Sequence, residues 1–181
     1  MQKIDTNWRA GEPRDLGNGL RLRWSRVDDT EAIFQLAGQV FRNHETAPFN
    51  ADTAGWILDL MSGEHPLMGP DDFLLVEDLA ADKPEPVAIT CYWHHTWEYG
   101  GTPFRVGRPE IVATQPAYRQ RGLVRALFEE LHKRSQAEGD LAQVITGIPY
   151  FYRQFGYEYA LDLSGGRMVP LVNIPAAQEG Q

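Results

Sequence analysis

The sequence predicts a single mixed α/β domain, and three observations lead to this prediction. Short apolar runs rich in β-branched and aromatic residues, typical of strands, alternate with longer segments whose apolar residues recur at helical spacing. The chain has 181 residues, of which 43% are hydrophobic, enough for one sizeable core. Turn-forming residues separate the segments, which read in order as strand, two helices, three strands, helix, strand, helix, strand.

Each element follows from a local pattern. Alternation of apolar and polar residues, or a short buried run, predicts strands at 20–24, 73–77, 87–97, 110–114, 141–146, 157–163 and 167–171. Helical periodicity behind an N-cap or a proline predicts helices at about 28–43, 51–62, 123–137 and 149–155. The polar segment 1–18 is expected to be a flexible arm, 19–172 the domain, and 173–181 a tail or linker.

The stretch 110–128 combines a strand, a basic loop and the start of a helix. Pro116 ends the strand, and a loop with Arg119, Arg121 and Gly122 leads into the helix. Such an arrangement brings free backbone N–H groups and the positive end of the helix dipole to one point. The pattern predicts a site for an anion such as a phosphate. The alternative is a solvated basic face at a helix start.

Charge and cysteine content narrow the class of protein. The net charge of −8 argues against general binding to nucleic acid or anionic membranes. The single cysteine, Cys91, cannot form an intramolecular disulfide, and its strand-like neighbours indicate a buried side chain. The N-terminal residues lack the apolar segment of a secretory signal, and no apolar run is long enough to span a membrane. A cytoplasmic protein is expected.

Two motifs give the chain a resemblance to the GNAT acetyltransferases, the general-control-related N-acetyltransferases. Residues 119–124, Arg-Gln-Arg-Gly-Leu-Val, are similar to the family motif of Arg or Gln, two residues, Gly, one residue, and Gly or Ala. Val124 departs from the small last residue, as in the enhanced-intracellular-survival (Eis) branch, which the motif also resembles. Residues 151–157 look like the aromatic-Tyr…Phe-Gly-Tyr signature of the family's fourth helix. The order of elements extends the resemblance over most of the chain.

The resemblance implies a GNAT-like fold, with a mostly antiparallel central sheet and about four flanking helices. It implies an N-acetyltransferase that transfers the acetyl group of acetyl-CoA, as co-substrate and without a metal, to a primary amine by direct attack. The acetyl-CoA site is expected at Val112, Ala113, Thr114, Arg119, Gln120, Arg121, Gly122, Leu123, Val124 and Arg125.

The resemblance also suggests which residue is the general acid. Tyr152 matches the family position, and a phenol with a pKa of about 10 is protonated at neutral pH and can protonate a thiolate. The other tyrosines of the segment, Tyr150, Tyr157 and Tyr159, are the alternatives.

The general base is expected to be Glu110, two positions before Val112 and therefore on the same face of the strand. An ion pair of Glu110 with Arg105 or Arg108 is an equal alternative to a role as base. Glu98, His94 and His95 are other candidates. Adjacent histidines on a strand face opposite sides, which also argues against a metal site.

The first two helices and the loop between them are expected to hold the acceptor. Aromatic contacts would come from Phe41, His44, Phe49 and Trp56, and Glu45 and Asp52 could receive a cationic amine. A small cationic molecule such as a polyamine or an aminoglycoside would suit this wall, and homo-oligomers are compatible with the sequence. The alternative function is a coenzyme A-binding domain without catalysis, either a sensor or the first domain of a longer Eis-like protein. A phosphate-loop NTPase is disfavoured, because Leu123 and Val124 replace its lysine and hydroxyl.

Overall fold

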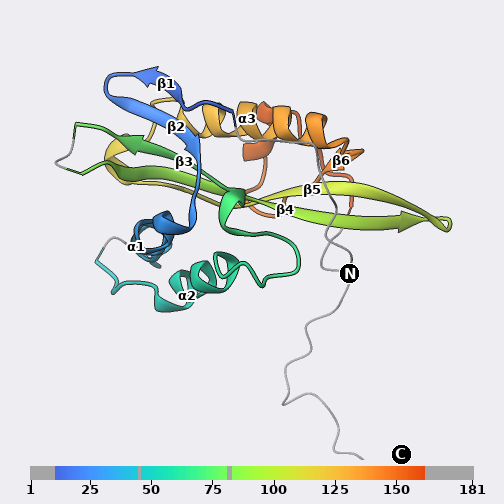
Figure 1. The fold of residues 1–181 in the computed structure, drawn as a ribbon, viewed down its shortest axis with the longest axis horizontal. Helices are drawn as coiled ribbons and strands as arrows, with labels where there is room; N and C mark the ends of the chain where they lie inside the picture. The colour runs from blue at the N-terminus through green and yellow to red at the C-terminus, as the bar shows by residue number, and fades with distance from the viewer. Residues whose placement is uncertain (1–10, 45, 81–82, 162–181) are drawn as a thin grey trace, which may run out of the picture. The chain divides into compact units, whose positions relative to one another are not determined.

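The computed structural model describes residues 11–44, 46–80 and 83–161. These residues belong to two compact units, one ending at Gly147 and one beginning at Ile148, and each unit is described by itself. The first unit contains every β-strand and α-helix found in the described residues (Figure 1). The predicted mixed α/β fold is confirmed. Among the described helices, none is long and apolar enough to cross a membrane.

A six-stranded sheet, as far as the chain is described, forms the centre of the first unit. Its strands lie side by side in chain order, and all pairs are antiparallel except β5 with β6, which are parallel. The strands are β1 Arg14–Gly17, β2 Leu20–Trp24, β3 Phe73–Asp78, β4 Glu85–Tyr99, β5 Thr102–Thr114 and β6 Ala142–Gln143.

Helices cover both faces of this sheet (Figure 1). Helices α1 (Thr30–Val40) and α2 (Ala51–Leu60) pack on one face, and α3 (Leu123–Glu138) packs on the other. The side chain of Asn50 caps α2 by accepting a hydrogen bond of 3.0 Å from the Thr53 amide.

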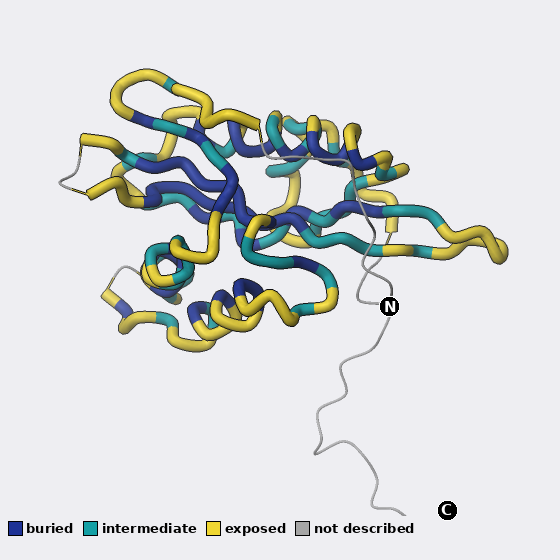
Figure 2. The backbone as a smooth tube through the Cα atoms, in the orientation of Figure 1, coloured by how far each residue is buried: buried dark blue, intermediate teal, exposed yellow. Residues whose placement is uncertain are grey.

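The two faces carry two separate apolar clusters, and buried residues follow the middle strands (Figure 2). Ile33 and Ile57 of the first two helices pack on Ile89 of β4, whereas Leu127 of α3 packs on the opposite face. Cys91 is fully buried in the first cluster, as expected, and burial raises the pKa of its thiol far above the usual range. A thiol in this environment is inert as a nucleophile at neutral pH.

β4 and β5 form a long hairpin that reaches beyond the other strands (Figure 1) and contains a bulge. Cys91 pairs with Glu110, but Ile89 pairs with Ala113, so β5 has one extra residue here. Ile111 within the bulge has a φ of +52°, a conformation that β-branched residues rarely adopt. On the other side of β5, pairing with β6 covers only Val106 and Gly107 in the described chain. β5 therefore leaves β6 before the bulge.

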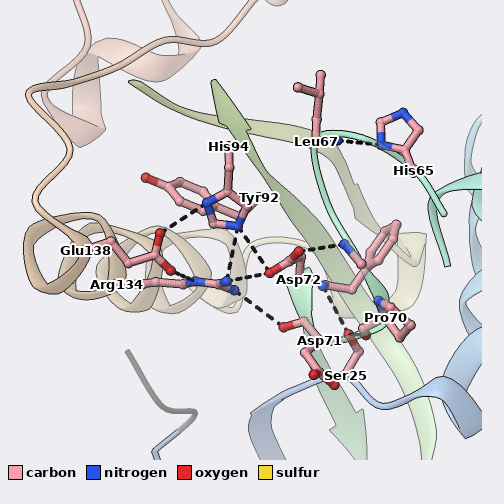
Figure 3. A network of polar contacts seen from close by, with 12 residues as sticks. Ser25, His65, Leu67, Pro70, Asp71, Asp72, Tyr92, His94, Arg134 and Glu138 are labelled. Carbon is pink, nitrogen blue, oxygen red and sulfur yellow. Dashed lines mark hydrogen bonds and ion pairs between the residues drawn. The ribbon is translucent and has the colours of Figure 1, made fainter. Parts of the chain in front are cut away.

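A network of buried charges joins α3 to β4 and to the loop before β3 (Figure 3). His94 of β4 places Nδ1 3.1 Å from Glu138 Oε2 and Nε2 3.3 Å from Asp72 Oδ1. Arg134 of α3 pairs with Asp72 and, over 2.7 Å, with Glu138. Arg105 of β5 adds a further ion pair of 2.7 Å to Glu138. The network fixes the C-terminal half of α3 to the sheet.

The network makes stability depend on the charge of His94. Burial alone would lower the pKa of His94, but hydrogen bonds to Asp72 and Glu138 outweigh it and raise the pKa from 6.5 to about 9. The charged form of His94 therefore stabilises the folded state fully below pH 6.5, and this contribution is lost as the pH rises through 9. The contribution amounts to at most roughly 3 kcal/mol.

We expect the unfolding free energy, measured with urea between pH 6 and 10, to fall over this window. The His94→Gln variant, which keeps polar atoms but cannot titrate, should lack this component of the fall. An equal slope in the two proteins would contradict the role given to His94.

The structure differs from the predicted elements in five places. The strand predicted at 110–114 forms the second half of β5, which begins at Thr102. The segment 1–18, expected to be an arm, contains β1, and residues 1–10 lie outside the described chain. The strand predicted at 141–146 is reduced to the two residues of β6. The predicted helix 149–155 is a 3-10 helix, Phe151–Phe155, so the described chain has three α-helices rather than about four. Residues 157–161 are not a strand, while 162–163, 167–171 and the predicted tail 173–181 fall outside the described residues.

Candidate functional site

The loop between β5 and α3 places an uncapped helix start at the surface. A short 3-10 helix, Pro116–Tyr118, follows β5, and the chain then turns through Gln120 and Gly122, with φ of +61° and +75°. Gly122 is the N-cap of α3 and has no side chain that could cap it, and the first turn contains no acidic residue. The helix dipole is therefore left without a negative partner from the loop itself.

The backbone N–H groups of residues 120–124 donate to no other group within the described chain. Those of Leu123 and Val124 lie in the first turn, where no acceptor exists in the helix. The side chain of Val124 is half-buried and does not remove its amide from this set. Consecutive free amides at a helix start are suited to bind a phosphate or another anion.

The loop arginines are exposed and partly held by the loop itself. Arg119 donates through Nε to the carbonyl of Thr114 over 3.4 Å. Arg121 donates to the carbonyl of Ala117 over 3.0 Å, and its guanidinium lies 4.8 Å from the ring centre of Tyr118. Arg125, one turn into α3, is exposed as well. Positive charge therefore surrounds the free amides, as the sequence predicts.

The predicted cofactor residues on β5 lie just after the bulge. Ala113 is buried in the cluster beneath α1 and α2, whereas Val112 and Thr114 are half-buried. The hydroxyl oxygen of Thr114 is buried without a hydrogen-bond partner in the described chain. The bulge is held by Thr90, whose hydroxyl donates to the carbonyl of Glu110 over 3.0 Å. The strained backbone of Ile111 within this bulge is typical of functional sites.

Glu110 forms an ion pair, one of the two roles that the sequence allows. Its Oε1 lies 2.6 Å from Nη2 of Arg108 and accepts a 3.2 Å hydrogen bond from Thr146. The expectation that Glu110 shares a face with Val112 is wrong. It assumed regular alternation of side chains between the two residues, and the bulge interrupts that alternation. Glu110 and Ala113, three positions apart, pair with Cys91 and Ile89 of one face of β4.

The other candidate bases on β4 have different environments. His94 belongs to the charge network with α3, whereas His95 pairs with Val106 and lies near the ring of Trp93. Burial lowers the pKa of His95, and the positive charge of Arg108 lowers it further. The imidazole of His95 is therefore neutral at pH 7. Glu98 is exposed near the hairpin tip. The two histidines do face opposite sides of the sheet, and in the described chain no group of three side chains could hold a metal ion.

The predicted acceptor wall is dispersed over α1, α2 and the loop between them. Phe41 ends α1 and packs partly against the core, and His44 is exposed with Nδ1 3.1 Å from the Thr46 hydroxyl. Trp56 is 64% exposed on α2. Phe49 is occupied by packing, because its ring covers Gly38 so closely that a Cβ there would overlap it. Glu45 lies outside the described residues.

Tyr152 lies in the second unit, in the 3-10 helix Phe151–Phe155. It is half-buried, and its ring centre is 6.2 Å from that of Tyr157. Burial, with Tyr152 as a second cause, raises the pKa of Tyr157, which disfavours Tyr157 as a proton donor. Tyr150 and Tyr159 are exposed, and Arg153 lies over both rings. Tyr152 therefore differs from Tyr150 and Tyr159, which are exposed, and from Tyr157, whose pKa burial raises.

The sequence interpretation missed a pocket beside the free amides. It has a volume of about 360 Å³ and lies between the β1–β2 hairpin and the start of α3. Its lining consists of Leu16, Asn18, Leu20, Arg121, Gly122, Leu123 and Ala126. The signal in the sequence was the Gly17-Asn18-Gly19 turn, which marks a hairpin and not an arm.

Comparison with known proteins identifies the family. Residues 21–160 match the family model described as an acetyltransferase (GNAT) domain. A search of curated proteins finds no match to the sequence.

Solved structures share the fold at low identity. A GNAT family acetyltransferase from Brucella melitensis in complex with acetyl-CoA is 18% identical, with a TM-score of 0.61, over 78% of this chain and 84% of that one. Glucosamine-6-phosphate N-acetyltransferase from Arabidopsis thaliana is 14% identical, with a TM-score of 0.57, over 83% and 97%. A protein of unknown function from Enterococcus faecalis V583 is 18% identical, with a TM-score of 0.60, over 77% of this chain and 32% of that one. The chain thus spans about a third of the Enterococcus protein. Because the family model matches well over half of the residues, this chain belongs to the GNAT acetyltransferase family.

Proposed function

We propose that this protein is an N-acetyltransferase that uses acetyl-CoA to acetylate a primary amine. The observation that supports the proposal most is the uncapped start of α3, where free amides and exposed arginines meet next to a bulged strand. A pyrophosphate needs several N–H donors and little steric bulk, and Gly122 with the amides of 120–124 meets both needs. A structural neighbour from Brucella melitensis was solved with acetyl-CoA, which agrees with this assignment.

In the proposed reaction the neutral amine attacks the thioester carbonyl, and coenzyme A leaves as a thiol. Backbone amides near 112–114 of β5, where β6 no longer pairs, would stabilise the developing oxyanion. Tyr152 would protonate the departing thiolate, and Glu110 would accept the proton of the amine. The ion pair with Arg108 occupies Oε1 of Glu110 and, in the described chain, leaves Oε2 free to accept a proton directly or through water.

A pair of glycine variants tests the binding of acetyl-CoA. Gly122 and Gly139, at the two ends of α3, both have a φ of +75° and open space around the Cα, so alanine costs similar strain at each, about 1 kcal/mol. Only Gly122→Ala adds a methyl group beside the proposed pyrophosphate. We expect calorimetry to show at least tenfold weaker acetyl-CoA binding for Gly122→Ala and wild-type binding for Gly139→Ala. Equal affinities in the two variants, or no binding by the wild-type protein, would reject the site.

Tyr152→Phe tests catalysis separately from binding. Removal of a general acid typically lowers turnover by ~10²–10⁴-fold, so we expect a loss in this range with an unchanged dissociation constant for acetyl-CoA. Tyr150→Phe is the control, because Tyr150 is exposed in the same segment. Thiol release would be measured with a panel of amines that includes polyamines and aminoglycosides. Unchanged turnover of Tyr152→Phe would show that another group is the acid.

The same panel distinguishes the alternative function. A coenzyme A-binding domain without catalysis would bind acetyl-CoA in calorimetry but release no thiol with any amine. The bulky Val124 in the motif further favours the Eis-like branch within the family. A small cationic acceptor remains our proposal, supported by the exposed Trp56 and by Asp52 on the same helix.

A further inference from the structure

We propose that Asp78, the last residue of β3, is a positioning residue for the binding of acetyl-CoA. Asp78 lies outside the loop that carries the free amides, but it holds Tyr118 of that loop, and Tyr118 supports the guanidinium of Arg121. The inference rests on the proposed function, since it names a residue that sets the strength of the same anion site. Asp78 itself contacts no ligand and acts through its two neighbours.

Two contacts lead from Asp78 to the arginine. The Tyr118 hydroxyl donates a hydrogen bond of 2.6 Å to Oδ2 of Asp78. The Arg121 guanidinium lies over the Tyr118 ring, 4.8 Å from its centre, where the negative face of the ring attracts a cation. Arg121 also donates to the Ala117 carbonyl over 3.0 Å, and a guanidinium has further N–H groups that can bind a phosphate. The place of Arg121 therefore depends on the place of the ring.

The position of Asp78 is itself fixed. Its Oδ1 accepts a 2.8 Å hydrogen bond from the Ala80 amide, a contact by which an aspartate holds a turn. Its backbone pairs with Leu20 of β2 on one side and with Glu85 of β4 on the other. The hydrogen bond from Tyr118, and next that from Ala80, lowers the pKa of Asp78. The carboxylate is therefore ionised at neutral pH, and the bond from the phenol is charge-assisted.

The Tyr118 contact lies where the anchored part of the loop gives way to the free amides. Before it, the Gln115 amide donates to the Val87 carbonyl over 2.9 Å, and the Gln115 side chain donates to the Pro86 carbonyl over 3.3 Å. After it come the amides of 120–124, which donate to no group within the described residues. Without the Tyr118 hydroxyl, the ring and the guanidinium on it would gain freedom that ligand binding must then remove, at a cost in affinity.

Removal of one hydroxyl group tests the proposal. Tyr118→Phe keeps the ring beneath Arg121 but loses the hydrogen bond to Asp78, and Tyr99→Phe, at an 85% exposed position, is the control. In calorimetry we expect Tyr118→Phe to bind acetyl-CoA roughly fivefold more weakly, the effect of one hydrogen bond. Tyr99→Phe should bind it as the wild-type protein does. In an Arg121→Ala background, Tyr118→Phe should have no further effect, because it acts through Arg121.

A pair of aspartates tests the same contact from the side of β3. Asp15 accepts a 2.8 Å hydrogen bond from the Gly17 amide, as Asp78 does from Ala80, but Asp78 is the one that holds Tyr118. We expect Asp78→Ala to weaken acetyl-CoA binding about as much as Tyr118→Phe, and Asp15→Ala to leave it unchanged. Asp78→Asn keeps an oxygen for the hydroxyl and should bind more tightly than Asp78→Ala. A carboxylate alone would repel phosphates, so tighter binding by Asp78→Ala than by the wild-type protein would overturn the proposal.

Salt distinguishes positioning of a charge from a general loosening of the loop. Screening weakens a contact between a guanidinium and a phosphate. The affinity of the wild-type protein for acetyl-CoA should therefore fall with added sodium chloride more steeply than that of Tyr118→Phe or Arg121→Ala. Thermal unfolding would confirm that each variant folds, and Asp78→Ala supplies the test if Tyr118→Phe does not fold.

Two results would overturn the role of Asp78 and leave the proposed function intact. One is an unchanged affinity of Tyr118→Phe for acetyl-CoA, and the other is an equal weakening by Tyr118→Phe in the presence and in the absence of Arg121. If the wild-type protein does not bind acetyl-CoA, the proposed function fails and this inference fails with it.

Discussion

Gly107→Ala is expected to lower the unfolding free energy by about 3 kcal/mol or more. A Cβ at this position would lie 2.7 Å from Cε2 of Tyr92 and closer still to its Cζ and hydroxyl oxygen. Neither the backbone of Gly107 nor the ring of Tyr92 can move away from this contact. Gly107 pairs with His94 on one side and Gln143 on the other, and the fully buried Tyr92 donates its hydroxyl to Asp140.

Urea denaturation, followed by tryptophan fluorescence, would measure this loss. Gly55→Ala is the matched control, since Gly55 lies in α2 with open space around it and without a positive φ. That variant should gain roughly 0.5–1 kcal/mol, because alanine is the better helix former. A Gly107→Ala protein as stable as the wild type would mean that the contact with Tyr92 is not a constraint in solution.

Arg134→Met is the second substitution with a large expected effect, a loss of about 3–5 kcal/mol. Methionine keeps most of the apolar stem but removes the guanidinium that pairs with Asp72 and Glu138. Both carboxylates are buried, and although burial alone would raise their pKa values, their partners keep them low and ionised. Without Arg134, His94 and Arg105 are left to compensate two buried negative charges.

Lys133→Met is the control for this substitution. Lys133 is the neighbour of Arg134 in α3, but it is exposed, and among the described residues its one ion pair is with Glu130 over 3.1 Å. An exposed pair of this kind contributes about 0–1 kcal/mol. Chemical denaturation of both variants at pH 7 should therefore separate them by at least 2 kcal/mol. A difference within the error of the method would show that the buried network contributes little net stability.

Much of the fold could be predicted because its signals are local. The helices α1, α2 and α3 follow from apolar periodicity, caps and terminal glycines, and the structure begins and ends them within a few residues of the predictions. The inner strands β3 and β4 are apolar enough to be recognised without their partners, whereas only 110–114 of β5 could be recognised. β1 was missed because an exposed edge strand of Arg14–Gly17 has no apolar alternation. The short β6 was overestimated because pairing with β5 depends on where β5 departs from it.

The candidate site likewise has one part that could be predicted from local sequence and another that could not. The basic glycine loop and the start of α3 are consecutive in sequence, so their joint position could be predicted from residues 119–125 alone. The face on which Glu110 lies could not, because a bulge shifts the alternation by one residue and nothing in the segment 110–114 marks it. The pocket beside Gly122 required β1, whose pairing was not recognised.

The sequence by itself determined the mixed α/β class, the family motif at 119–124 and the helix start that carries the free amides. These properties depend on residues within a few positions of one another. Only the tertiary structure decided that Glu110 pairs with Arg108, and that His94 faces α3 while His95 faces the opposite side. It also decided that Gly107 must remain without a side chain beneath Tyr92. Each of these results depends on strand register and on contacts between distant segments, which local sequence patterns do not encode.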